Sequence, residues 1–307
     1  MGYLCAYYRY YHPLEFITSF LNNAANEDDI KTGSEYAGRI GIQVTMPKWG
    51  VSRGNYSFDT DKNTIAKGLS SIKYLGDKVA DELYRVSKEK QCKNFVDVLY
   101  AIDRDTSLDT RQLEILIKID FFSEFGNQRE LLYIKDLFYD MFKRGEAKKI
   151  SRNYVDGTKL EPVVKKYAVG VTKNGGEAKS YTLLDIKSLL DECETTIKGA
   201  GMEDLDEASK AKNFADVAGY VGYVSGREED KRKLYVMDVH PLKRRSDNKQ
   251  FGYSVITKSI GSGKEARFSI VNRVYEETPI NKGDVVVCLS YIREGKYFKM
   301  TKYEKIM

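Results

Sequence analysis

Residues 64–84 read Thr64-Ile-Ala-Lys-Gly-Leu-Ser-Ser-Ile-Lys-Tyr-Leu-Gly-Asp-Lys-Val-Ala-Asp-Glu-Leu-Tyr84. A tight break, Lys73-Tyr-Leu-Gly76, interrupts a series of apolar residues at roughly helical spacing. Because a new helix is expected directly after the break, the pattern predicts a helix-hairpin-helix. Gly76 is expected to permit a backbone conformation that a side chain would obstruct. The apolar residues are Ile65, Leu69, Ile72, Val79, Ala80 and Leu83.

The helix expected after Gly76 begins with free N–H groups and the positive end of the helix dipole. Such groups can hold a DNA phosphate, a contact that positions the backbone without reading sequence. The six residues of the turn are therefore candidates for binding duplex DNA: Lys73, Tyr74, Leu75, Gly76, Asp77 and Lys78. An ordinary helix–turn–helix corner in an α-helical domain has the same pattern and is the alternative for this stretch taken alone.

The sequence from Leu4 to about Leu132 resembles the C-terminal part of the polymerase region in bacterial replicative DNA polymerases of the C family, the polymerase III alpha subunits. Separate blocks carry the resemblance in the family's order. They are Leu4-Cys-Ala-Tyr-Tyr-Arg-Tyr-Tyr-His-Pro-Leu-Glu-Phe16, Gly41-Ile-Gln-Val-Thr-Met-Pro47, Ile65 to Leu83, Arg111-Gln-Leu-Glu-Ile-Leu-Ile-Lys118 and Phe121 to Arg129. The first block is similar to the final fingers helix, and the last three are similar to the helix-hairpin-helix domain.

Three positions depart from the family's pattern. Tyr74 stands where the family usually has the first hairpin glycine, and Asp120 stands where a second hairpin would carry glycine. Lys48-Trp-Gly50 replaces the usual Asp-Ile-Asn after the proline.

Composition excludes several classes of protein. The chain has 307 residues, of which 42% are hydrophobic and 31% charged, and this suits two ordinary domains. No apolar run is long enough to span a bilayer, and the aromatic start does not look like a secretory signal, so we expect a cytoplasmic protein without membrane contact. Cys5, Cys92, Cys193 and Cys288 are scattered, and both histidines precede a proline. We therefore expect no disulfide, no metal site and no cofactor.

The positive charge is concentrated at the C-terminus. The net charge is +5, but residues 213–307 contain 18 basic and 12 acidic residues. The rest of the chain is almost neutral, so the excess points to nucleic-acid contact by the C-terminal part.

The C-terminal part also changes its sequence period. Six runs rich in β-branched and aromatic residues, separated by turn signals, predict a small closed barrel. These runs are 217–224, 233–239, 252–257, 266–271, 284–289 and 297–301. Gly219-Tyr-Val221 and Lys282-Gly-Asp284 resemble parts of an OB-fold, which the polymerase family carries downstream of its hairpins for single-stranded DNA. Exposed rings that could stack on bases are Tyr220, Tyr235, Tyr253 and Phe268, and cations that could follow phosphates are Arg244, Arg245, Lys249 and Arg267.

These observations predict an α+β chain with an α-helical helix-hairpin-helix domain followed by an all-β OB-fold-like barrel. We expect four parts: the end of the fingers with a short β segment at 1–60, the hairpin domain at 61–144, a linker and helical connector at 145–212, and the OB-fold at 213–307. A helix is expected at Leu183–Ile197 in the connector, where we find no family resemblance.

The resemblance implies a role in DNA replication, with duplex and single-stranded DNA as partners. It also implies that the family's palm, with its three metal-binding aspartates, lies upstream of the segment seen here. Since two-metal phosphoryl transfer needs such ligands, we expect no catalytic residue in this chain. The expected function is a non-catalytic DNA-holding portion of a polymerase, with the remaining polymerase portion or other replisome subunits as protein partners.

Two other readings stay open. The chain could be a stand-alone nucleic-acid or protein-interaction module derived from a polymerase, or an independent enzyme with a site that the sequence does not reveal. Within the polymerase reading, the sequence does not distinguish a truncated product, a fragment and one half of a split polymerase.

Overall fold

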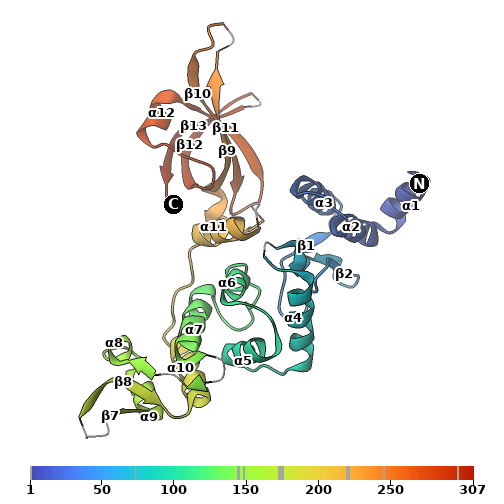
Figure 1. The fold of residues 1–307 in the computed structure, drawn as a ribbon. Coiled ribbons are helices and arrows are strands. Elements are labelled where there is room, and N and C mark those ends of the chain that lie inside the picture. Colours follow the sequence, from blue (N-terminus) through green and yellow to red (C-terminus); the bar gives the residue numbers. More distant parts are fainter. Residues whose placement is uncertain are drawn as a thin grey trace. The chain divides into compact units, whose positions relative to one another are not determined.

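The chain folds into two compact units, Met1–Asp204 and Leu205–Met307 (Figure 1). The first is mainly helical and the second contains a closed five-stranded barrel, so the predicted α+β class is confirmed. The four-part division expected from the sequence stays a prediction. The computed structural model describes residues 2–72, 74–143, 146–147, 149–171, 176–218, 222–244, 246–295 and 297–307.

The first unit begins with two helices that are separated at His12-Pro13. They are α1 (Gly2–Tyr11) and α2 (Pro13–Asn22). A third helix, α3 (Glu27–Arg39), is capped by the Asn26 side chain, which accepts a hydrogen bond from the N–H of Asp29 at 2.9 Å. Helices α2 and α3 bury one face against a small sheet, whereas α1 buries none of its residues.

That small sheet corrects one prediction. Its order is β1 (Gln43–Thr45), β3 (Thr64–Ala66), β2 (Ser57–Asp59), with β1 and β3 parallel and β2 antiparallel to β3. Ile65 was expected in a helix, but it is fully buried in the central strand. β-Branched Thr64 and Ile65 suit a strand, and the Phe58 segment pairs with β3 on the side opposite β1.

The rest of the hairpin region is helical. After the single 3₁₀ turn η1 (Leu69–Ser71) come four helices that bury apolar faces against one another: α4 (Asp77–Glu89), α5 (Phe95–Asp105), α6 (Thr110–Lys118) and α7 (Gln128–Met141). The helix expected before the break is therefore one turn long. Gly68 lies in front of it, and a Cβ there would stand 2.4 Å from the carbonyl oxygen of Gly54, so backbone passes too closely for a side chain.

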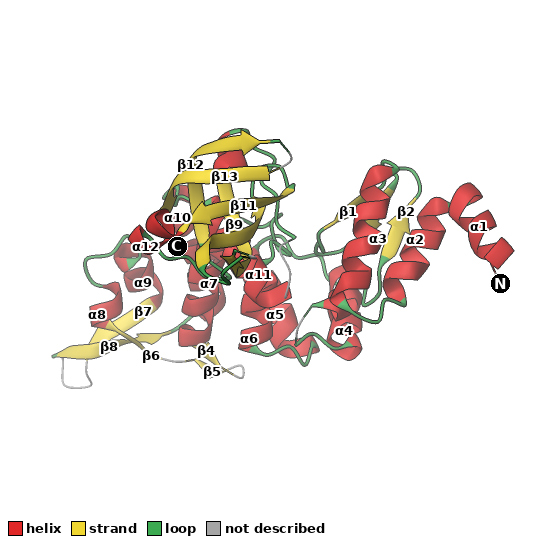
Figure 2. Cartoon of the chain, turned by 90° about the horizontal axis from the view of Figure 1, so that it is seen from above, coloured by secondary structure: helices red, strands yellow, loops and turns green. Residues whose placement is uncertain are grey.

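Residues 142–204 complete the first unit. They form the β4–β5 ribbon, the sheet β6–β8–β7 and the helices α8, α9 and α10 (Figure 2). The helix expected at 183–197 is α10, at Ile186–Gly199. The remaining bounds are β4 Phe142–Lys143, β5 Glu146–Ala147, β6 Lys149–Ser151, α8 Arg152–Val155, α9 Glu161–Tyr167, β7 Ala168–Val171 and β8 Glu177–Leu183.

A buried carboxylate fastens α10 to the hairpin helices. The Glu194 side chain is 2% exposed, and it accepts hydrogen bonds from the N–H groups of Phe95 at 2.9 Å and Val96 at 2.8 Å. These N–H groups begin α5, so the carboxylate neutralises the positive end of that helix. Lys198 pairs with the same carboxylate at 2.6 Å. The segment after the hairpins is thus packed into the first unit.

The second unit is a closed barrel with strand order β10–β11–β13–β12–β9 (Figure 2). All neighbouring strands are antiparallel except β11 and β13, which run parallel through Phe268 opposite Phe298. A short helix, α12, follows the third strand, and this arrangement is that of the predicted OB-fold-like barrel. The bounds are α11 Glu207–Ala218, η2 Glu229–Arg232, β9 Lys233–Lys243, β10 Gln250–Ser259, β11 Glu265–Val271, α12 Asn272–Glu277, β12 Val285–Glu294 and β13 Tyr297–Lys305.

Five of the six predicted strand runs are confirmed by β9 to β13. The first run, 217–224, is wrong where the structure describes it, because residues 217–218 end α11 and residues 222–224 form no strand. Gly219-Tyr-Val221 lies outside the described residues. The barrel closes without this run, since β9 pairs directly with both β10 and β12.

Candidate nucleic-acid interface

Both hairpin turns contain a residue with left-handed backbone. Tyr74 has φ +69° and Asp120 has φ +61°, and these are the two positions where the resemblance described above leads us to expect glycine. Left-handed backbone is costly for a residue with a Cβ, by about 1–2 kcal/mol. The hairpin turns therefore keep the backbone shape for which glycine is suited, although this sequence supplies larger residues.

Gly76 does not have the role expected for it. Its φ is −86° and its ψ is 164°, which any residue adopts, and a Cβ at this position would meet nothing within 4 Å. The expectation that Gly76 permits a conformation closed to other residues is wrong, because the left-handed position is Tyr74. Gly76 is instead the N-cap residue of α4, and it offers no side-chain oxygen to that helix.

Helix α4 consequently begins without a side-chain cap. Five other helices of the first unit are capped by side-chain oxygens, from Asn26 for α3, Asn94 for α5, Asp109 for α6, Asn127 for α7 and Asp185 for α10. The helix after the second hairpin is α7, and its capping box already satisfies its first N–H groups. The open helix start therefore lies at the first hairpin.

The side chain of Leu75 is buried in the turn. Its side chain is 4% exposed, and its N–H donates to the carbonyl oxygen of Ile72 at 3.1 Å. Leu75 as a contact to DNA stays a prediction, and its backbone N–H already bonds within the turn. Asp77, Lys78 and Gly76 lie on the exposed side of the turn. Lys73 lies outside the described residues.

Charged side chains around the turn are partly paired. Lys78 lies 3.8 Å from Glu82 one turn later, with 79% of its side chain exposed. The backbone N–H and the hydroxyl of Ser107 donate to Glu82 and hold the pKa of its carboxyl below the ordinary value. Asp77 adds a second carboxylate in the first turn of α4. The cation at the helix start is thus exposed but shared with acidic neighbours.

A further cation reaches the turn from the second hairpin. The Arg111 guanidinium lies over the Tyr74 ring, 4.3 Å from its centre, and Tyr74 is 60% exposed. Beside it, the Gln112 amide donates to the carbonyl oxygen of Tyr74 at 2.7 Å. The sequence did not single out Arg111 for binding, because only the tertiary fold brings α6 to this turn.

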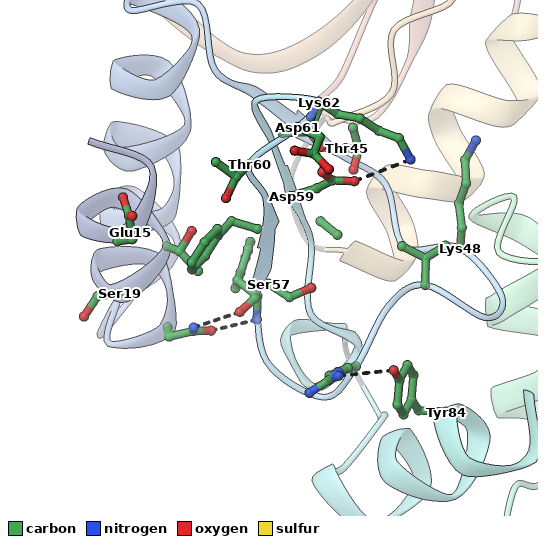
Figure 3. A pocket seen from close by; sticks show the side chains of 18 of the residues that line it. Glu15, Ser19, Thr45, Lys48, Ser57, Asp59, Thr60, Asp61, Lys62 and Tyr84 are labelled. Atoms are coloured by element: carbon green, nitrogen blue, oxygen red, sulfur yellow. Dashed lines mark hydrogen bonds and ion pairs between the residues drawn. The ribbon is translucent and has the colours of Figure 1, made fainter. Parts of the chain in front are cut away.

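A groove of about 1330 Å³ lies between α2, the small sheet and α4 (Figure 3). Its cations are Lys48, Arg53, Lys62 and Lys88, and its carboxylates are Glu15, Asp59 and Asp61. The backbone N–H of Lys62 and then its ammonium hold the pKa of Asp59 below the ordinary value. Arg53 donates to the Tyr84 hydroxyl at 3.2 Å. This balance of charges does not favour an anion over a neutral ligand.

Two of the aromatic rings expected to be exposed on the barrel are buried. Tyr235 is 7% exposed and Phe268 is 6% exposed, so the prediction of exposure is wrong for both. Phe268 belongs to the barrel core, and Tyr235 packs under α11. Tyr253 is half-buried and stacks on Tyr275 of α12, with ring centres 3.6 Å apart. Tyr220 lies outside the described residues.

The predicted cations of the barrel are exposed where they are described. Arg244 and Lys249 lie together, because the Arg244 N–H donates to the Lys249 carbonyl oxygen at 2.9 Å and closes the β9–β10 turn. Arg267 lies opposite Ile256 in the middle of the β10–β11 pair, away from that turn. Arg245 lies outside the described residues.

Neither a cluster of metal-binding side chains nor a membrane-spanning helix is present among the described residues. No three His, Cys, Asp or Glu side chains there are grouped so that they could hold a metal ion. Nor is any helix there both long enough and apolar enough to cross a membrane.

Comparison with known proteins agrees with the hairpin geometry. Residues 41–132 match the family model of the helix-hairpin-helix motif, and this range contains both left-handed turns. Fold and site therefore define a chain that carries a helix-hairpin-helix motif in its first unit and a closed barrel in its second.

The particular relatives are DNA polymerase III alpha subunits, so the resemblance seen in the sequence is confirmed. That of Ureaplasma parvum is 23% identical over 145 residues, which cover 47% of this chain and 15% of the relative. That of Campylobacter jejuni is 30% identical over 131 residues, which cover 42% of this chain and 11% of the relative. That of Treponema pallidum is 28% identical over 138 residues, which cover 43% of this chain and 11% of the relative. The matched part thus spans 11% to 15% of these relatives' own length.

Proposed function

We propose that this chain is a DNA-binding portion of a DNA polymerase III alpha subunit, and that its first hairpin holds the phosphate backbone of duplex DNA. The observation that carries the proposal is the uncapped start of α4, which lies inside the matched helix-hairpin-helix range. A helix start with free N–H groups is an anion-binding site.

The grip has a simple chemistry. A phosphate oxygen accepts hydrogen bonds from the first N–H groups of α4, and the exposed ammonium of Lys78 adds charge. Arg111, held against the Tyr74 ring, supplies a second cation with a fixed position. Lys73 belongs to the same proposal on the grounds of sequence alone. All of these groups are proposed to contact phosphate and none a base edge, so binding is independent of the DNA sequence.

The barrel is proposed to bind single-stranded DNA. The exposed cations Arg244, Lys249 and Arg267 support this, as does the excess of basic residues in 213–307. Since contacts to phosphate release bound counterions, this binding is weak at physiological salt and strengthens steeply at low salt.

The wider setting follows from the relatives. We propose that the chain works in replication in the cytoplasm, beside the remaining polymerase portion or other replisome subunits, and that it incorporates no nucleotide by itself. Purified chain on a primed template with magnesium should give no extension. Extension that persists after contaminating polymerase is excluded would contradict this part of the proposal.

The hairpin is tested by duplex affinity at low salt on two unrelated sequences, measured by fluorescence anisotropy. Lys78→Ala and Arg111→Ala should each weaken binding equally on both sequences and lower the salt slope by about 1. Arg39→Ala is the matched control, an exposed arginine on α3 paired with Glu35. Unchanged affinity in both hairpin variants would contradict phosphate binding by the turn and would leave it only a structural role.

A second candidate function is protein contact through α1. This helix buries no residue, and Tyr3 and Tyr10 are 81% and 77% exposed. Such a row of rings suits a stand-alone interaction module derived from a polymerase. Deletion of residues 2–11 should leave duplex affinity unchanged under the DNA-binding proposal and should abolish protein contact under this one.

A further inference from the structure

A second pocket opens in the wall of the barrel, away from the β9–β10 turn that carries Arg244 and Lys249. Its volume is about 430 Å³, which lies within the usual range for small-ligand pockets. It is lined by residues of η2, of the β10–β11 turn and of strands β9, β11, β12 and β13. The sequence pattern did not point to it, because these segments meet only when the barrel closes.

The described charged side chains that line this pocket are all positive. The described residues that line it include Lys231, Arg232 and Lys264 and no carboxylate. Lys231 pairs with Glu228, whereas within the described residues neither Arg232 nor Lys264 forms an ion pair. The groove of the first unit, with three carboxylates, differs in this respect. The charge at this pocket therefore selects an anion.

Aromatic rings form the other part of the lining. Phe268, Tyr291 and Phe298 surround one another, with ring centres 5.8 to 6.0 Å apart and steep angles between the rings. Phe268 is buried in the barrel core, whereas Tyr291 is 56% exposed. A ring that stays exposed at the edge of an apolar pocket can stack on a flat ligand.

A nucleotide combines an anionic phosphate with a flat base that can stack on an aromatic ring. We propose that this pocket receives one unstacked nucleotide of single-stranded DNA, with its base against Tyr291 and Phe298 and its flanking phosphates near Arg232 and Lys264. The two cations come from separate segments, η2 and the β10–β11 turn, which suits a strand with a phosphate on each side of the base. This inference rests on the proposed binding of single strands by the barrel and names the place of contact.

The test uses the full chain and a thymidine oligonucleotide that carries one 5-iodouracil. Near-ultraviolet irradiation should link the base to Tyr291 or Phe298, identified by mass spectrometry of the peptides. In anisotropy at low salt, Tyr291→Ala should weaken binding about 10-fold, in line with the loss of one stacked base, and Tyr291→Phe should keep most of the affinity. Arg232→Ala with Lys264→Ala should lower the salt slope.

Tyr297→Ala is the matched control, because Tyr297 is 75% exposed on the same barrel and does not line the pocket. Cross-links elsewhere, with Tyr291→Ala binding like the wild type, would overturn this inference and leave single-strand binding by the barrel intact. No binding of the oligonucleotide at low salt would overturn both. If thymidine monophosphate binds as tightly as the oligonucleotide, the pocket is a site for free nucleotides and the assignment to a strand is wrong.

Discussion

The guanidinium of Arg111 lies 4.3 Å from the centre of the Tyr74 ring, and so joins the second hairpin to the turn of the first. The side-chain amide of the neighbouring Gln112 donates a hydrogen bond to the Tyr74 carbonyl oxygen and so holds the same turn. Tyr74 therefore combines a strained backbone with two partners from α6, and those partners offset part of the strain.

Gly76→Ser should stabilise the protein and weaken its grip on DNA. The new hydroxyl caps α4, and the unfolded chain loses freedom, so the free energy of unfolding should rise by on the order of 0.5–1 kcal/mol. The same hydroxyl occupies N–H groups proposed for phosphate. Denaturant unfolding and duplex anisotropy measure the two effects.

Gly76→Ala is the control for that variant. It adds a Cβ in the same open space but no oxygen, so duplex affinity should stay near the wild type. Equal loss of affinity in the serine and alanine variants would show that bulk, and not capping, disturbs the site.

Tyr74→Val should destabilise the first unit, because a β-branched residue fits left-handed backbone poorly. We expect a loss of about 1–2 kcal/mol on unfolding, part of it from the lost contact with Arg111. Tyr74→Asn also loses that contact but tolerates φ +69°, so it should be more stable than the valine variant. Equal stabilities in chemical denaturation would show that the backbone strain is unimportant.

Asp77→Asn should tighten duplex binding. Its carboxylate in the first turn of α4 repels a phosphate at the helix start, and an exposed pair of charges interacts by about 1 kcal/mol at close range. We expect roughly threefold to tenfold higher affinity at low salt, fading as salt screens the charges. Asp81→Asn, one turn further along α4, should have a smaller effect; an equal effect would place the phosphate elsewhere.

Glu194→Ala should destabilise the first unit strongly. Its removal leaves the N–H groups of Phe95 and Val96 buried without their acceptor, and we expect a loss of roughly 2–4 kcal/mol. Glu192→Ala removes a carboxylate of the same helix that pairs with Lys166 at the surface, and it should cost much less than Glu194→Ala because exposed ion pairs contribute little to stability. Similar losses in the two variants, measured by urea unfolding, would contradict the capping role of Glu194.

The sequence predicted what depends on local pattern. The helix start at Asp77 and five barrel strands follow from turn residues and apolar periodicity, which act over a few neighbours. Ile65 was misplaced because a short apolar run with spacing of three or four residues suits a helix or a buried strand equally well.

Other features depend on contacts between distant segments. Phe268 alternates correctly along its strand, but only the register with β13 decides that its ring faces the core. Arg111 reaches Tyr74, and Glu194 reaches α5, through packing that no local pattern encodes. The role of Gly76 was predicted wrongly because the left-handed residue of this turn is Tyr74, and tyrosine seldom adopts left-handed backbone.

The strand order of the barrel determines when its strands can pair during synthesis on the ribosome. β9 is completed by pairing with β12, and β11 by pairing with β13, so the barrel closes only after its last strand has emerged. The hairpins of the first unit form from near neighbours and can fold earlier. During elongation the β9–β10–β11 meander exposes two open edges and its apolar face, and a pause in translation before β13 would leave it open to aggregation.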